Sequence, residues 1–176
     1  MKLVKRITIN TIILFFAFTM NGQSINANLS KVNFTATNMK WMSVDGTFTG
    51  MNGELSFDES DYERASFNVC VDAASVNTEN GQRDTHLKNE DFFHVTKYPS
   101  ICFTSSSISK TNKGFTTTGT LDMVGTSKDV TINFTHTDGK FVGNLKINRL
   151  EHNVGATTGT FMVGDEIDLE IIAVTQ

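Results

Sequence analysis

Hydrophobic and polar residues alternate with a period of two along several stretches of this chain. In residues 114–123, Phe115, Leu121 and Met123 fall on one side, whereas threonines and Asp122 occupy the other. The same alternation recurs in residues 31–37, 43–50, 66–72, 100–105, 129–136, 140–148 and 165–174. This period is typical of β-strands with one face in a core and the other in water.

Turn-forming residues separate the predicted strands, as in TNKG at 111–114 and TDGK at 137–140. The many Thr, Val, Ile and Phe residues also favour strands. Because about eight antiparallel strands form a natural closed barrel, the predicted fold class is all-β, an antiparallel eight-stranded barrel. A two-sheet sandwich is the alternative that the same pattern allows.

One polar segment, DTHLKNEDFFHV at residues 84–95, interrupts the strand pattern. It lacks alternation and consists of helix-compatible residues, and Asp84 is placed to serve as an N-cap. We therefore expect a short helical segment near residues 80–94, followed by a turn. Pro99 then marks the start of the next strand, where a missing N–H is tolerated.

The inner face of the predicted strands mixes bulky phenylalanines with small residues. Its glycines are Gly46, Gly50, Gly119 and Gly143. Inward glycines either leave space for a ligand or allow strands to bend at barrel corners, and both explanations stay open. Ser105 and Thr117 at inner positions favour a cavity wall over a dense core. A cavity lined mainly by aromatic and aliphatic side chains would take an apolar ligand.

The N-terminus has the layout of a secretory signal peptide. Basic residues lie near the start, an apolar stretch ends near Met20, and small residues follow. The apolar part is too short to span a bilayer comfortably, which argues against the alternative of an uncleaved anchor. We predict a signal peptide at residues 1–23, a single domain at residues 24–176, and a periplasmic or secreted location.

Removal of the signal peptide would leave a strongly acidic domain. The whole chain has 15 basic and 19 acidic residues, and losing three basic ones leaves 12 against 19, a net charge of −7 with His neutral. Such a charge disfavours electrostatic binding to nucleic acid or to an anionic membrane surface. We therefore predict no nucleic-acid partner.

The two cysteines, Cys70 and Cys102, are too few to form a disulfide scaffold. Both alternate with inward residues, so both are expected to face outward on the strands that flank the polar segment. If these strands are neighbours, the thiols could form a surface disulfide. Two free thiols are the alternative, because pairing needs Cα atoms within ~7 Å of each other.

No arrangement of residues in the sequence indicates catalysis. The histidines are His86, His94, His136 and His152, and none lies in a metalloprotease or Cys/His pattern. An Asp-x-His pair at residues 84–86 is a weak metal signal, for which a capping or solvated role is the better explanation. The serines at 105–107 lack a nucleophile-elbow motif. We predict no enzymatic activity, no metal site and no cofactor.

Three blocks of sequence carry a family likeness. Residues 75–108 contain Arg-Asp-x-His-Leu, Asp-Phe-Phe and Tyr-Pro in order, residues 119–134 read GTLDMVGTSKDVTINF, and KINRLEHNVG and VGDEIDLEI follow near the C-terminus. In order and spacing these blocks resemble the YceI-like family of exported lipid-binding proteins, across nearly the whole predicted domain. Asp122 and the pair Leu150–Glu151 depart from the family pattern.

The resemblance implies a lipocalin-like antiparallel barrel with a helical segment near its mouth. It also implies an elongated hydrophobic tunnel that can hold a polyisoprenoid chain, such as an isoprenoid quinone or a related lipid. On this basis the expected ligand-binding residues are Phe34, Phe48, Phe67, Val69, Leu87, Phe92, Phe93, Phe103, Leu121, Phe134 and Leu145. Leu87, Phe92 and Phe93 would form an apolar lid, with plain core as the alternative. Trp41 either lines the tunnel or braces a loop.

The Arg-Asp-x-His motif has two explanations. Arg83, Asp84 and His86 either cap and pin the short helix or contact a lipid headgroup near the opening. We favour pinning, because Asp is a good N-cap and Arg pairs readily with carboxylates.

The resulting prediction is an exported protein that sequesters an apolar lipid and exchanges it with a transient membrane or protein donor and acceptor. One alternative is a protein-interaction module with a solid core. The other is an enzyme that modifies a lipid or quinone, for which His136 is the inward-phase candidate. The sequence predicts neither the identity of the lipid nor the oligomeric state, and it does not separate transport from storage or stress protection.

Overall fold

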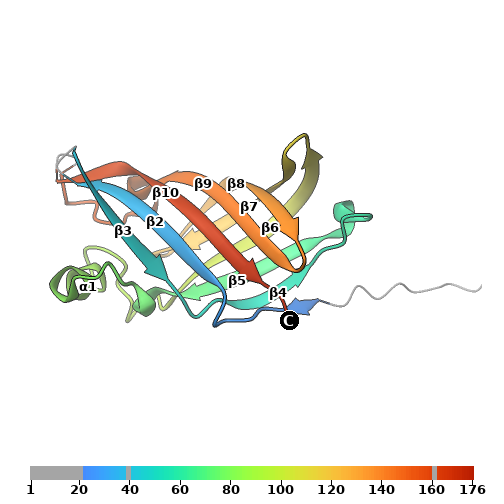
Figure 1. Cartoon of the computed structure of the whole chain (residues 1–176). Coiled ribbons are helices and arrows are strands. Elements are labelled where there is room, and N and C mark those ends of the chain that lie inside the picture. Colours follow the sequence, from blue (N-terminus) through green and yellow to red (C-terminus); the bar gives the residue numbers. More distant parts are fainter. Residues whose placement is uncertain (1–21, 39–40, 160–161) are drawn as a thin grey trace, which may run out of the picture.

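The computed structural model describes residues 22–38, 41–159 and 162–176. The predicted signal peptide at residues 1–23 lies outside the described residues, apart from its last two positions. The described strands form one ten-stranded antiparallel sheet that coils into a barrel-like shell, with a helix at one end (Figure 1).

The strands are β1 (Gln23–Ser24), β2 (Lys31–Asn38), β3 (Met42–Phe48), β4 (Asn52–Ser56), β5 (Ser66–Asp72), β6 (Ser100–Thr111), β7 (Gly114–Met123), β8 (Thr126–Thr137), β9 (Lys140–Asn148) and β10 (Val163–Val174). The α-helix is α1 (Gly81–Leu87), and the short 3-10 turns are η1 (Tyr62–Arg64), η2 (Ala73–Ser75) and η3 (Arg149–His152).

The strand order is β1-β4-β5-β6-β7-β8-β9-β10-β2-β3, so β1 and β3 are the edges of the sheet. In the described part of the chain no ladder joins the two edge strands, so the barrel closes only in part. Two isolated bridges, Ile25 to Thr175 and Thr47 to Asn77, attach the chain near these edges to the rest of the shell. The predicted all-β antiparallel barrel is confirmed, whereas the sandwich alternative is wrong, because all the described strands belong to one sheet.

The number of strands differs from the prediction of eight, because β1 and β4 were not expected. β1 has two residues and β4 has five. Segments this short show too little alternation to stand out from a loop. They form strands because they pair with residues elsewhere in the chain: Gln23 of β1 lies opposite Leu55 of β4, and Leu55 lies opposite Phe67 of β5.

Strand β7 shows why alternation identified the longer strands. Phe115, Thr117 and Leu121 are buried, whereas Asp122 is exposed. At the predicted TDGK turn, Asp138 and Gly139 have φ values of 49° and 74°. Two consecutive positive φ angles make the tight hairpin turn that Asp-Gly favours, and this turn joins β8 to β9.

The inward glycines make room for neighbouring side chains. A Cβ at Gly46 would lie 2.6 Å from Cε1 of Phe34, and one at Gly119 would lie 2.7 Å from Cζ of Phe103. Each glycine thus accepts an aromatic ring from the adjacent strand. The explanation that these glycines leave open space is therefore wrong for Gly46 and Gly119, and any hollow lies elsewhere in the shell.

Helix α1 confirms the predicted helical segment but corrects its cap. The N-cap is Asn80, whose side chain accepts a hydrogen bond from the Arg83 amide at 3.1 Å. Asp84 instead lies within the helix, and its carboxylate accepts hydrogen bonds from the amide and hydroxyl of Thr78 at 2.8 and 2.5 Å. Both Asn and Asp suit this position, so the sequence alone could not distinguish them.

The Arg-Asp-x-His motif makes contacts within its own segment. Arg83 donates hydrogen bonds from Nε to the Thr78 hydroxyl and from Nη2 to the Thr78 carbonyl, both at 2.8 Å. His86 Nε2 lies 2.8 Å from Oδ2 of Asp91. These contacts hold α1 to the residues on either side of it, which is the pinning role that we favoured.

Candidate functional site

The barrel surrounds a partly open cavity of about 210 Å³. An apolar cavity of ~150 Å³ is already large enough to take a benzene-sized guest. The structure places every predicted ligand-binding residue in the wall of this cavity, namely Phe34, Phe48, Phe67, Val69, Leu87, Phe92, Phe93, Phe103, Leu121, Phe134 and Leu145. The wall is therefore made almost entirely of aliphatic and aromatic side chains.

Trp41 does not belong to this wall, and the suggestion that it lines a tunnel is wrong. Its side chain is 81% exposed, just before β3. A position between two strands carries no alternation from which its direction could be inferred, which is why the sequence left it open.

Strand β10 contributes more of the wall than we expected. Val163, Ile167, Leu169 and Ile171 all contact the cavity. The alternation in residues 165–174 already placed most of these residues on one face. The register explains their position, because β10 pairs with β2 on one side, where Leu169 lies opposite Phe34. On its other side β10 pairs with β9.

The segment after α1 closes one part of the cavity. Phe92 is buried in a small cluster with Met123 and Val154. Phe93 packs edge to face on Phe48 with ring centroids 5.2 Å apart. Both Phe92 and Phe93 also line the cavity, so the same side chains pack the segment and form part of the cavity wall.

Arg149 is the one charged side chain in the described cavity wall, and the sequence analysis did not select it. The residue is 2% exposed. Its guanidinium donates to main-chain carbonyls of residues 154, 155, 158, 163 and 164 at 2.6–3.1 Å. Every N–H direction of the group is thus occupied by protein.

The surroundings of Arg149 act on its charge in two ways. Burial lowers the pKa of the guanidinium, while the nearby Asp165 carboxylate raises it. The two side chains lie 3.5 Å apart. Since all five N–H groups donate to main-chain carbonyls, the arginine links η3 to the segment that leads into β10 and offers no free donor to the cavity. An arginine in the KINRLEHNVG block was the available signal, but its direction could not be inferred from a 3-10 turn.

His152, next to this arginine in η3, is also buried, at 2% exposed. Burial lowers the pKa of its imidazole, and a hydrogen bond with the Thr126 main chain opposes that shift. Its Nδ1 atom has no hydrogen-bond partner among the described residues. The ring is therefore held neutral near physiological pH.

Cys70 and Cys102 form a disulfide between the adjacent strands β5 and β6. Their Cα atoms are 4.1 Å apart, within the limit of ~7 Å that pairing requires. Both residues are half-buried and contact the cavity. The disulfide that the sequence left open against two free thiols therefore forms, with both cysteines half-buried rather than fully exposed.

His136 does not line the cavity. Its Nδ1 atom lies 3.0 Å from Oε1 of Glu59, and its ring packs on Phe141 with centroids 4.5 Å apart. The side chain is 20% exposed. His136 thus has the predicted inward phase and packs on the aromatic core at the end of the barrel, but it lies outside the cavity wall that a lipid-modifying role would require.

The described residues contain no group of three or more His, Cys, Asp or Glu side chains arranged to hold a metal ion. None of the helices in the described part of the chain is long and apolar enough to cross a membrane.

A model of the YceI-like domain matches residues 23–175. Protein YceI of Shigella flexneri is 37% identical over 101 residues, which are 57% of this chain and 53% of that protein. The chain thus spans about half the length of the curated relatives that it matches.

Solved structures share the fold. The crystal structure of Burkholderia cenocepacia BcnA aligns with a TM-score of 0.77 and 25% identity, covering 86% of this chain and 99% of that one. A polyisoprenoid binding domain from Saccharophagus degradans aligns with a TM-score of 0.64 and 15% identity, covering 87% and 98%. At that identity, the second likeness concerns the fold alone.

Proposed function

This chain belongs to the YceI-like family, and from that premise we propose that it binds a long apolar lipid of the polyisoprenoid class inside its barrel. The chain of the lipid lies in the cavity, and its binding free energy comes from apolar surface that leaves water, at about 25 cal/mol per Å².

The observation that carries this proposal is the chemistry of the cavity wall. Its residues are aliphatic or aromatic with few exceptions, and the one charged side chain, Arg149, is fully occupied by main-chain carbonyls. Such a wall offers a ligand shape and apolar contact but almost no free hydrogen-bonding groups. A protein-interaction module with a solid core would be close-packed inside, and a hollow of about 210 Å³ does not fit such packing.

The comparisons support the ligand class. A domain of the same fold from Saccharophagus degradans is a polyisoprenoid binding domain. The likeness to that domain concerns the fold, whereas the match to the YceI-like domain over residues 23–175 is a match in sequence. We propose binding without catalysis, as transport, storage or sequestration, with transient exchange at a membrane or with a protein.

Export is a second part of the proposal. The basic and apolar residues that open the chain have the layout of a signal peptide. A disulfide between Cys70 and Cys102 is also typical of proteins in an oxidising compartment. N-terminal sequencing of the mature protein from a cell fraction outside the cytoplasm would test cleavage near Gln23, and recovery of an uncleaved cytoplasmic chain would contradict it.

Native mass spectrometry of the protein, purified without detergent and then extracted with organic solvent, tests lipid binding. We expect a stoichiometric adduct with the mass of a prenyl lipid, released by the solvent. A protein that is empty after purification and stays empty after incubation with prenyl alcohols and quinones would refute the proposal.

A further inference from the structure

Phenylalanines close the end of the barrel that lies away from α1. The buried members of this group are Phe57, Phe67, Phe115, Phe134 and Phe141. Three of them, Phe67, Phe134 and Phe141, also line the cavity. The hollow therefore ends against aromatic rings, and what lies behind those rings decides whether it can extend further.

Phe57 lies directly behind them. It is the first residue after β4 and is 7% exposed. Its ring centroid is 5.4 Å from that of Phe141, 5.6 Å from Phe134 and 6.0 Å from Phe67. Phe57 does not contact the cavity itself. It is the side chain that backs all three lining rings at once.

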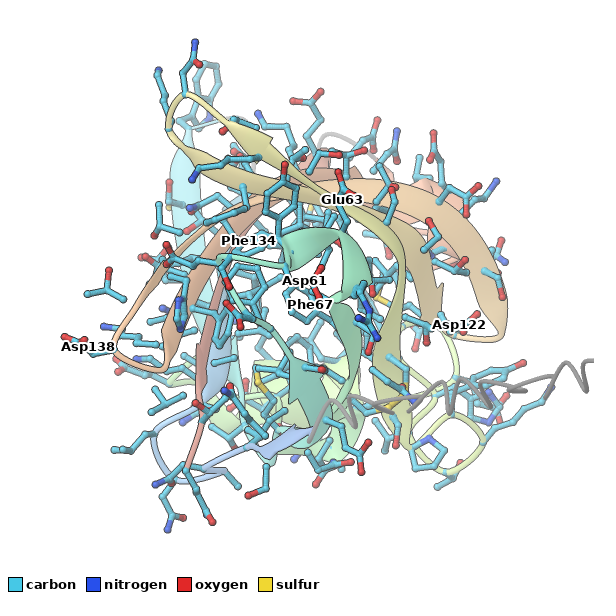
Figure 2. The ribbon with its side chains drawn as sticks, turned by 90° about the vertical axis from the view of Figure 1, so that its right-hand side faces the viewer. Asp61, Glu63, Phe67, Asp122, Phe134 and Asp138 are labelled. Atoms are coloured by element: carbon cyan, nitrogen blue, oxygen red, sulfur yellow. A yellow bond between two sulfur atoms is a disulfide. The ribbon has the colours of Figure 1, made fainter. Side chains whose placement is uncertain are left out.

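The connection that carries Phe57 crosses this end of the barrel. Figure 2 looks onto the end, and the connection that carries Asp61 and Glu63 runs across the middle of the view, near Phe67 and Phe134. Ser60 donates hydrogen bonds from its amide and hydroxyl to Asp58 at 2.8 and 2.6 Å. These bonds fold the connection back on itself.

A contact with the barrel wall fixes the connection from outside. Glu59 lies 3.0 Å from Nδ1 of His136 on β8, and the His136 ring packs on Phe57 with centroids 5.1 Å apart. Tyr62 of η1 packs on Phe115 at 5.8 Å. Phe57 is therefore held between His136 and the lining rings, and any other orientation of its ring would break these contacts.

We propose that Phe57 is the stop that sets the longest apolar chain the cavity can enclose. This inference rests on the proposed lipid-binding function and adds its length specificity. A chain that reaches Phe67, Phe134 and Phe141 cannot advance, because Phe57 prevents those rings from moving outward. Further units of a longer chain stay outside the cavity, in water, and add no affinity.

The physical consequence is a plateau in affinity against chain length. Each methylene that leaves water tightens binding by up to about fourfold, and a methylene that stays in water adds nothing. Replacing Phe57 with a small residue lets the lining rings move into the vacated volume. The plateau should then begin at a longer chain, whereas the affinity for short chains should not change.

The test uses prenyl alcohols of increasing length, farnesol, geranylgeraniol and solanesol, with intermediate prenols between them. Dissociation constants are measured for the purified full chain, for Phe57→Ala and for the milder variant Phe57→Leu, which keeps the test valid if the alanine variant unfolds. Phe115→Leu is the matched control. Phe115 is similarly buried and contacts Phe57, but of the three lining rings its own ring packs on Phe134 alone.

We expect the first prenol beyond the wild-type plateau to bind Phe57→Ala at least about tenfold more tightly than wild type, given the methylene increment above. Farnesol should bind both proteins alike, and Phe115→Leu should keep the wild-type plateau. An unchanged plateau in both Phe57 variants would overturn the inference and leave the lipid-binding function intact. An equal shift in Phe115→Leu would also overturn it, because general loosening would then be the cause. Wild-type protein that binds no prenol would refute the proposed function itself.

Discussion

Arg149 and Asp165 lie 3.5 Å apart in an ion pair whose partners differ greatly in exposure, with the arginine side chain 3% and the aspartate side chain 35% exposed. One oxygen of Asp165, Oδ1, is buried without a hydrogen-bond partner among the described residues. The charge of the arginine is therefore stabilised mainly by hydrogen bonds to the main-chain carbonyls between η3 and β10. The same hydrogen bonds hold that part of the chain in place.

Replacing Arg149 with methionine should destabilise the protein strongly. The change keeps much of the side-chain volume but leaves several carbonyls and Asp165 without their partner. Loss of one member of a buried, hydrogen-bonded charge group typically costs about 3–5 kcal/mol. Urea denaturation followed by circular dichroism measures this free energy of unfolding.

Arg64→Met is the matched control for that experiment. Arg64 pairs with Asp61 at 3.6 Å, but the two side chains are 56% and 44% exposed. Exposed pairs contribute little, so the change in unfolding free energy should stay within about 0.5 kcal/mol. Equal effects of the two substitutions would show that Arg149 is not the anchor of the connection.

Phe103→Asp should abolish lipid binding. Phe103 lines the cavity on β6, and a carboxylate there would have to give up its hydration whenever a lipid enters. Thr104→Asp places the same charge on the next, exposed residue of the strand and should leave binding unchanged. Fluorescence displacement of an apolar dye gives the affinity, and circular dichroism establishes that both variants are folded.

Normal lipid affinity in folded Phe103→Asp would mean that the ligand does not occupy this part of the barrel. Loss of binding in Thr104→Asp as well would point to a general electrostatic effect of the added carboxylate.

His152 should make the protein less stable in mildly acidic solution. Burial lowers the pKa of its imidazole in the folded protein below the ordinary value of 6.5, so the unfolded chain binds a proton more readily. The stability from neutral His152 is complete above about pH 6.5 and is lost as the pH falls toward the folded-state pKa.

The pH dependence of the unfolding free energy between neutral and mildly acidic pH measures this effect. It should be weaker in His152→Leu than in wild type. His86→Gln is the control, because the His86 side chain is 58% exposed, and it should retain the wild-type dependence. A His152→Leu variant with an unchanged pH dependence would assign the acid sensitivity to other groups.

The disulfide between Cys70 and Cys102 should contribute substantially to stability. It joins residues that are 32 positions apart, and closing a loop of that length in the unfolded chain is worth about 3–4 kcal/mol in the chain-entropy model. Replacing both cysteines with serine should lower the denaturation midpoint by a corresponding amount. A thiol assay on the denatured, unreduced wild-type protein should find no free thiol, and two reactive thiols would show that the bridge is absent in solution.

The sequence by itself determined the strands and the direction of their side chains. Successive residues of a strand point to opposite faces, so an alternation with period two indicates the side of the strand on which each side chain lies. Phe34, Phe103 and Leu145 were for this reason assigned to the interior without knowledge of their neighbours. The polar segment with Phe92 and Phe93 stood out for the same reason, since it broke the period.

The tertiary structure decided which of those side chains meet. Strand register brings the Phe34 ring over Gly46 and joins Cys70 to Cys102, and pairing across the chain makes strands of β1 and β4. The same long-range contacts place Phe57 behind the lining rings and surround Arg149 with carbonyls. Local periodicity carries no information about such contacts, because they depend on how the whole sheet curls and closes. The inner face of each strand is thus a property of the sequence, whereas the shape and length of the hollow between the strands are properties of the fold.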